Sequence, residues 1–163
     1  MTTIISFNER KSINKRRYPL YPLVGVGAVV LREDKVLLVR RAAPPGKGKW
    51  SIPGGLVEVG ERLGDAAVRE LYEETGVRAK PVGVIDIEEY IERDPSGRVV
   101  YHYVIVDVLV EPFGDLNPSP RSDALDVGFF SIRDALKMEL TTSTRRFLHK
   151  LLENAGSIRV IEL

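Results

Sequence analysis

Four acidic residues and an arginine lie close together between positions 61 and 74 of the chain: Glu61, Arg69, Glu70, Glu73 and Glu74. At about 100° per residue of an α-helix, the last three glutamates fall within an arc of roughly 100°. Carboxylates placed this closely repel one another unless a cation lies between them. The stretch offers only oxygen ligands, and the chain has no cysteine. A hard ion such as Mg²⁺ or Mn²⁺ is therefore favoured over zinc.

A second interpretation of the same residues needs no metal ion. The glutamates could form a solvated acidic helix face on which Arg69 pairs with Glu73 one turn later. Such surface pairs contribute little to stability. The spacing of the glutamates alone does not separate the two interpretations.

A helix and a loop must position these side chains. No proline interrupts the second half of the stretch 55–77, and Gly76 provides a helix stop. Gly54, Gly55 and Gly60 predict a loop in the first half, where small residues allow a backbone carbonyl to approach a metal ion. The residues expected to pack inward from the helix are Gly64, Val68, Leu71 and Thr75.

The complete pattern of the stretch decides between the interpretations. Gly55, Glu61, Arg69-Glu70-Leu71, Glu73-Glu74 and Gly76-Val77 occupy every fixed position of the Nudix box. The chain therefore resembles the Nudix hydrolases, over about residues 22–150. The resemblance implies an α/β fold in which a mixed β-sheet is sandwiched between helices (α/β/α). It also implies a metal-dependent hydrolase that cleaves a nucleoside diphosphate linked to another group.

The resemblance also implies roles for the box residues. Gly55, Glu70, Glu73 and Glu74 are expected to hold Mg²⁺, for which Mn²⁺ can substitute. The metal ion would neutralise phosphoryl oxygens and lower the pKa of water, which attacks phosphorus. Glu73 is expected to complete the metal site or take the proton of that water, Glu61 to reach the cluster from the loop, and Arg69 to hold a glutamate in place.

Basic residues before the box are candidates for binding a pyrophosphate. They are Arg40, Arg41, Lys47 and Lys49, which flank or lie in the loop 43–50. An exposed basic turn explains any single one of them equally well.

Further substrate contacts are expected after the box. Tyr103 could stack on an adenine, although packing is the commoner use of a strand tyrosine. In related enzymes a late acidic residue acts on the attacking water, which makes Asp123 and Asp126 candidates, although each could equally be a cap or turn residue. His102 is expected to be a hydrogen-bonded strand residue rather than a base. The general base stays unassigned.

The box does not reveal the substrate. ADP-ribose, cleaved to AMP and ribose 5-phosphate, is our first expectation, because the loop 43–50 and the turn 93–97 are similar to those of small members of that branch. The alternatives are a nucleoside triphosphate, in a housecleaning reaction, and the nucleotide cap of RNA. An alternative of another class is a domain that senses a nucleotide ligand without turnover.

Composition bounds the remaining properties. The 163 residues, 44% hydrophobic and 29% charged, suit one soluble domain at residues 18–163 after a basic arm at residues 1–17. No apolar run is long enough to span a membrane, and we expect a cytoplasmic protein. A net charge of +1 makes nucleic acid an unlikely partner. A homodimer is expected from the resemblance and from the apolar ends at residues 4–7 and 158–163.

The rest of the pattern predicts the following elements. Strands are expected at residues 2–7, 23–33, 36–41, 51–53, 82–92, 98–111 and 157–163, a short helix capped by Ser131, and a longer helix capped by Thr142 or Ser143 that ends at Gly156.

Overall fold

The computed structural model describes residues 16–154 and 157–163. The predicted strand at residues 2–7, most of the predicted arm at residues 1–17 and the predicted stop at Gly156 lie outside the described residues. Strands and helices within the described part form mixed sheets covered by helices, which confirms the α/β class.

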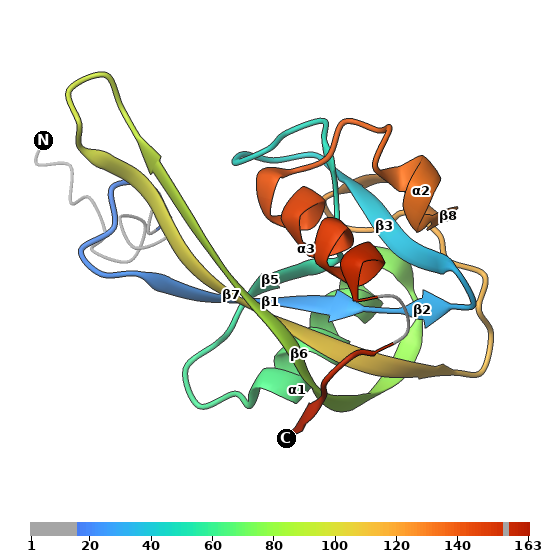
Figure 1. Ribbon diagram of the computed structural model, residues 1–163. Helices are drawn as coiled ribbons and strands as arrows, with labels where there is room; N and C mark the ends of the chain where they lie inside the picture. Colours follow the sequence, from blue (N-terminus) through green and yellow to red (C-terminus); the bar gives the residue numbers. More distant parts are fainter. Residues whose placement is uncertain (1–15, 155–156) are drawn as a thin grey trace, which may run out of the picture.

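A five-stranded mixed sheet runs through the molecule in the order β5-β1-β7-β6-β9 (Figure 1). Strand β1 (Leu23–Val29) is parallel to β7 (Val99–Phe113) and antiparallel to β5 (Gly54–Leu56). Beyond β7 lie β6 (Arg78–Arg93) and then β9 (Ile161–Glu162), each antiparallel to its neighbour. The nearly continuous apolar run of β1 suits a strand that is covered on both faces.

A smaller sheet is organised around β3 (Lys35–Arg41), which pairs antiparallel with three other strands. These are β2 (Leu31–Arg32), β4 (Trp50–Ser51) and β8 (Ala124–Ser131). The sequence predicted a single sheet, and the strands form two. The reason is that β3 pairs with β8, the strand that follows the long connection after β7. Strand β3 does not pair with β1.

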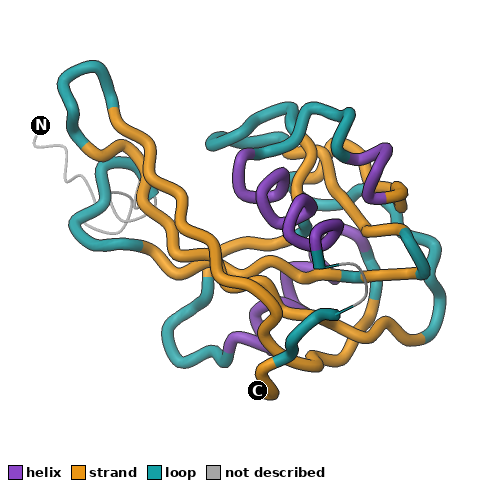
Figure 2. The backbone as a smooth tube through the Cα atoms, in the orientation of Figure 1, coloured by secondary structure: helices purple, strands orange, loops and turns teal. Residues whose placement is uncertain are grey.

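Helices lie on both sides of the main sheet (Figures 1 and 2). Helix α1 (Leu63–Thr75) covers one face, while α2 (Ile132–Ala135) and α3 (Thr142–Glu153) lie on the other side. No helix within the described residues is long and apolar enough to cross a lipid bilayer.

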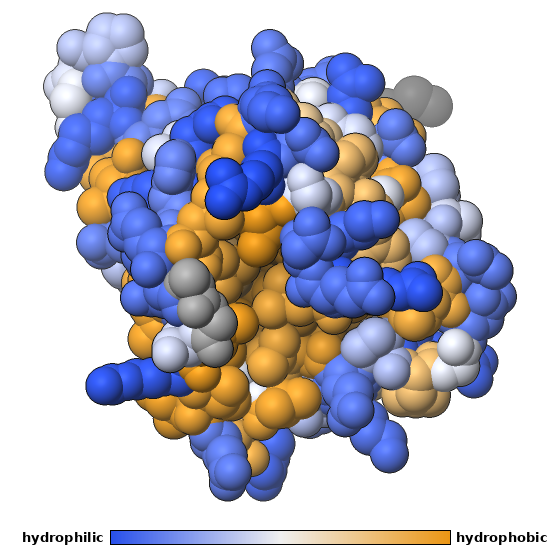
Figure 3. Space-filling model, turned by 45° about the vertical axis from the view of Figure 1, so that its right-hand side comes forward, coloured by the Kyte–Doolittle hydropathy of each residue, from blue (hydrophilic) through white to orange (hydrophobic). Residues whose placement is uncertain are grey.

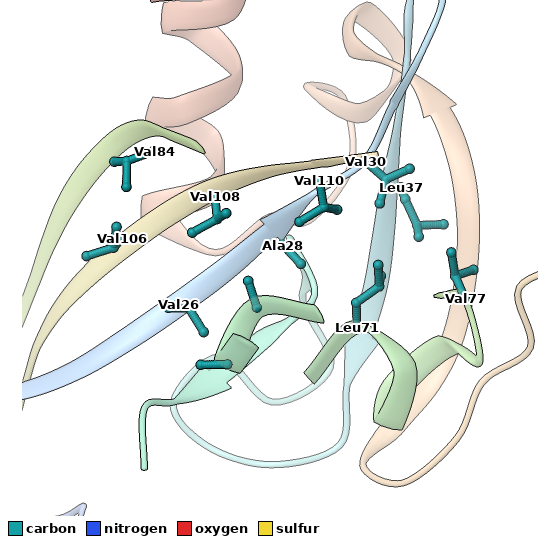
Figure 4. Packing of buried hydrophobic residues seen from close by; sticks show 12 residues of the cluster. Val26, Ala28, Val30, Leu37, Leu71, Val77, Val84, Val106, Val108 and Val110 are labelled. Carbon is teal, nitrogen blue, oxygen red and sulfur yellow. The ribbon is translucent and has the colours of Figure 1, made fainter. Parts of the chain in front are cut away.

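Two apolar clusters hold these layers together. Leu71 of α1 packs with Ala28 of β1 and Val108 of β7, as Figure 4 shows. On the opposite face, Phe147 of α3 packs with Val29 of β1. Full burial of a leucine or phenylalanine contributes about 1.5–3 kcal/mol. Helix α1, which carries the glutamates, is therefore fixed firmly against the sheet.

Three local predictions were wrong. The strand predicted at residues 23–33 is two strands, β1 and β2, which belong to different sheets. Gly54 and Gly55 belong to strand β5 and not to a loop, because they lie in register with Gly27 and Val26 of β1. The cap of α3 is Thr141, whose hydroxyl accepts a hydrogen bond from the Thr144 amide. Ser131 caps α2 as predicted.

Candidate active site

Glu70 lies where helix α1 meets strand β5. Its carboxylate accepts a hydrogen bond from Nη1 of Arg69 at 2.8 Å, and 15% of its side chain is exposed. A Cβ atom on Gly55 would overlap this carboxylate. Glycine at position 55 is therefore what allows the strand and the glutamate to come so close.

Arg69 connects the glutamates of the loop and the helix. Its Nε and Nη2 donate to the two carboxylate oxygens of Glu61 at 2.7 and 2.9 Å. Nη1 lies 3.6 Å from Glu73, in addition to its hydrogen bond with Glu70. The hydrogen bond from Arg69 and one from the Glu58 amide lower the pKa of Glu61 to about 2. Glu61 is thus ionised at neutral pH and fixed in orientation.

Glu74 points into the protein, where 6% of it is exposed. It accepts a hydrogen bond from the Gly54 amide at 3.0 Å. Burial, followed by the negative charge of Asp123, raises the pKa of Glu74 to about 8. The ionised form of this carboxylate therefore needs positive charge beside it at neutral pH.

The spacing predicted one acidic face on helix α1, and the alternative interpretation was that this face is solvated. The three helix glutamates do not share one solvated face. Glu73 has a side chain that is 50% exposed, whereas Glu74 is buried. Strand β5 accounts for the difference, because it lies over the side of α1 that carries Glu74 and supplies an amide to it. Of the residues expected to pack inward, Val68 is only half-buried.

A cavity of about 200 Å³ adjoins Glu70. It is bounded by strands β1, β5 and β7, the loop that follows β3 and the beginning of α3. Its lining includes these residues from the sequence prediction: Arg41, Lys49, Gly55, Glu70, Tyr103 and Asp123. The structure thus brings cations, aromatic rings and carboxylates from distant parts of the chain to one place.

Two of the predicted basic residues, Arg40 and Lys47, are not among the described residues that line the cavity. The register of β3 with β8 shifts between Arg40 and Arg41, and of these two residues only Arg41 lines the cavity. Nε of Arg40 donates to the Gly48 carbonyl at 3.0 Å, and Lys47 is exposed.

The strand residues near the cavity have the orientations expected from alternation. The rings of Tyr101 and Tyr103 are stacked with centroids 6.1 Å apart, and Tyr90 lies 6.5 Å from Tyr103. His102 instead has Nε2 3.2 Å from Glu89. Asp126 is exposed and accepts a hydrogen bond from the Val127 amide, so Asp123 is the one of the two acidic candidates that reaches the cavity.

The sequence profile of the NUDIX domain matches residues 22–151, a range that contains Gly55, Arg69 and the four glutamates. This chain is a Nudix hydrolase. Its α/β fold, its acidic helix and the glycine against Glu70 are the structural counterparts of the box pattern in the sequence.

Known proteins similar to this Nudix hydrolase differ in their named substrates. ADP-ribose pyrophosphatase of Methanocaldococcus jannaschii is 34% identical over 130 residues, which cover 80% of this chain and 74% of the relative. Human diphosphoinositol polyphosphate phosphohydrolase 3-alpha is 35% identical over 111 residues, covering 66% of this chain and 61% of the relative. Among solved structures, the MutT NUDIX hydrolase of Burkholderia pseudomallei has a TM-score of 0.70 at 29% identity, covering 80% of this chain and 98% of that one.

Nudix hydrolases generally use divalent metal ions, and the residues of this site suit one chemically. Within residues 16–154 and 157–163, no three carboxylate or imidazole groups are gathered into a ready-made metal cage. The donors at the site are nevertheless all oxygens, as hard cations prefer. The buried Glu74, with its raised pKa, is a carboxylate whose ionised form a cation would stabilise.

The sequence prediction missed several residues that line the cavity of this Nudix hydrolase. They are Arg16, Ser51, Tyr90, Asp107 and the segment 141–144. Asp107 did carry a signal, because it is the only charged residue in the apolar run 104–110. Serine and threonine gave none, because these residues are common in caps and turns.

Proposed function

We propose that this Nudix hydrolase cleaves ADP-ribose to AMP and ribose 5-phosphate, with Mg²⁺ as its metal ion and Mn²⁺ as a substitute. The observation that carries the proposal is that one cavity joins the acidic helix, the cations Arg41 and Lys49, and the tyrosines of β6 and β7. These three parts suit a metal ion, a diphosphate and a nucleoside. The relative named ADP-ribose pyrophosphatase supports the same choice.

The residues of the chain divide the chemistry in the following way. Glu70, Glu73, Glu74 and Gly55 would hold the metal ion, which supplies positive charge to the phosphoryl oxygens and acidifies water. Arg69 keeps Glu61 and Glu70 in place through its hydrogen bonds.

Proton transfer and diphosphate binding fall to other side chains. Glu73, which is the most exposed of the helix glutamates, would accept the proton of the attacking water if it does not complete the metal site, and Asp123 is the alternative base. Arg41 and Lys49 bind the diphosphate.

A second candidate substrate is a diphosphoinositol polyphosphate, because of the human relative with that name. The lining of the cavity argues for the nucleotide instead. A ring that carries many phosphates requires many cations, and the described lining supplies Arg16, Arg41 and Lys49. The same lining contains the buried carboxylate of Asp107, which would repel phosphate.

A substrate panel tests the proposal. With Mg²⁺ present, ADP-ribose should be cleaved faster than nucleoside triphosphates, dinucleoside polyphosphates, capped RNA and a diphosphoinositol polyphosphate, with products separated by ion-exchange chromatography. A triphosphate that is preferred tenfold in kcat/KM would favour the housecleaning reaction. Binding of ADP-ribose without cleavage of any compound would favour a ligand-sensing domain.

We also propose that the protein is a cytoplasmic homodimer. Exposed apolar side chains at Val160, Ile161 and Leu163 adjoin the edge of β6. Figure 3 shows further apolar surface gathered in a hollow on one face. Light scattering coupled to size-exclusion chromatography gives the mass directly, and a mass of one chain would contradict the dimer.

A further inference from the structure

The cavity continues from Glu70 across the main sheet toward Asp107. Gly54 of β5, Gly27 of β1 and Asp107 of β7 lie in register on three adjacent strands. Neighbouring strands are about 4.8 Å apart, so the Cα atoms of Gly54 and Asp107 are separated by about 10 Å. A nucleoside attached to a phosphate near Gly54 can therefore extend to Asp107.

Two glycines of β1 form part of the floor between these residues. Gly25 and Gly27 both line the cavity and present no side chain to it. A Cβ atom on Gly25 would meet nothing closer than the Gly55 carbonyl oxygen, at 3.4 Å. Tyr90 and Tyr103 lie on the same lining. A floor that has no side chain at Gly25 and is bordered by aromatic rings suits a planar ring system such as a nucleobase.

Asp107 is a buried acidic side chain that lines this floor. It is 4% exposed, and a Cβ atom on Gly27 would overlap its carboxylate. None of the described residues donates a hydrogen bond to that carboxylate. Buried polar groups are nearly always hydrogen-bonded, so a donor from a ligand would meet an unfilled requirement.

A second polar group of the same cavity also lacks a partner. The Ser51 hydroxyl is buried and has no hydrogen-bond partner among the described residues. Ser51 and Asp107 come from different sheets, and both line the cavity. Two such groups at one cavity indicate a site that is built for a polar ligand.

We propose that Asp107, whose carboxylate covers Gly27, determines base specificity by accepting a hydrogen bond from the 6-amino group of an adenine that lies on the floor at Gly25. This inference rests on the proposed function, since it places the nucleoside of ADP-ribose. A base with an oxygen at position 6, such as hypoxanthine, would set that oxygen against a carboxylate oxygen. Proteins that read DNA bases distinguish them in the same way, because each base presents its own pattern of hydrogen-bond donors and acceptors.

The electrostatic surroundings of Asp107 agree with this role. Burial, followed by the charges of Asp86 and Glu88, raises its pKa to about 7, while Lys150 acts in the opposite direction. A hydrogen bond from an amino group would stabilise the ionised carboxylate and offset the free-energy cost of burying its charge. At pH 8.5 the carboxylate is an acceptor only, which is the condition for the sharpest discrimination.

The experiment compares ADP-ribose with IDP-ribose, which differ at position 6 of the base. Measured with Mg²⁺ at pH 8.5, the parent protein should prefer ADP-ribose at least tenfold in kcat/KM. In Asp107→Asn the amide can donate to the 6-oxygen, so the ratio should fall to within threefold of one or invert. Gly25→Ala is the control: it fills the floor without reaching position 6, and both substrates should lose affinity equally.

Binding of AMP and IMP by calorimetry gives a readout that does not depend on hydrolysis. AMP should bind more tightly than IMP to the parent protein, and Asp107→Asn should remove the difference. An unchanged ratio in Asp107→Asn, or an equal fall for both nucleotides as expected for a carboxylate that holds ribose, would overturn the inference. If AMP selectivity is present but ADP-ribose is not cleaved, the proposed reaction is wrong and the base site stands.

Discussion

Asp107→Asn should stabilise the protein at alkaline pH, and the gain should shrink as the pH falls. The pKa of Asp107 rises from an ordinary 3.8 to about 7 in the folded protein. Between these values the folded protein binds more protons than the unfolded chain, so the free energy of unfolding falls as pH rises. At about 1.4 kcal/mol per pKa unit, the full loss in the parent is about 4 kcal/mol.

The asparagine variant cannot titrate at this position and should not suffer that loss. Its free energy of unfolding, relative to the parent, should rise by about 3 kcal/mol between pH 5 and pH 8.5. Urea unfolding in the presence of a chelator measures this quantity. The fluorescence of Trp50, the single tryptophan, is a suitable signal because its ring packs edge-on against Phe130 with centroids 5.0 Å apart.

Ser51→Ala is the matched control for this measurement. This substitution changes a buried hydroxyl of the same cavity, and a hydroxyl does not titrate in this pH range. The difference in free energy of unfolding between Ser51→Ala and the parent should therefore be equal at pH 5 and pH 8.5. If the difference in free energy of unfolding between Asp107→Asn and the parent is also equal at both pH values, Asp107 is not a buried carboxylate of raised pKa. The argument from burial would then be refuted.

Three substitutions test the arrangement around the glutamates. Arg69→Lys loses the paired hydrogen bonds to Glu61, and activity should fall about 10- to 100-fold with an unchanged circular dichroism spectrum. Gly55→Ala displaces the Glu70 carboxylate, and kcat should fall about 100-fold, as measured in steady-state assays. Arg41→Ala removes a cation of the cavity, and KM for ADP-ribose should rise about tenfold with little change in kcat.

Arg40→Ala is the control for the last of these. Arg40 and Arg41 each donate from Nε to a carbonyl of the same loop, but only Arg41 lines the cavity. Equal rises in KM for the two variants would show that the arginines act by holding the loop. Parental activity in Arg69→Lys or in Gly55→Ala would contradict the roles assigned to those residues.

The regular spacing of the Nudix box made the central helix and its glutamates predictable from the sequence. The box consists of local positions within one helix and the preceding segment, so helical geometry alone places Glu70 and Glu74 one turn apart. The direction in which Glu74 points was not predictable, because it depends on strand β5, whose Gly54 amide approaches from outside the helix.

The cavity was harder to predict because its residues come from distant parts of the chain. Arg41 and Tyr103 were identified by residue type, but Arg40 looked equivalent to Arg41, and the irregularity of β3 between them is visible only in the folded structure. Asp107 meets Gly27 only through the parallel pairing of β1 with β7. Long-range register of this kind has no signature in a single sequence.

The kcat/KM for ADP-ribose, compared between the parent and Glu70→Gln with and without Mg²⁺, tests the central claim most directly. We expect cleavage to AMP and ribose 5-phosphate that is lost with a chelator and restored by Mg²⁺. Glu70→Gln should reduce kcat/KM at least about 100-fold, while its melting temperature without metal is equal to or above that of the parent. Full turnover in the presence of chelator, or near-parental turnover in Glu70→Gln, would contradict a metal-dependent site on helix α1.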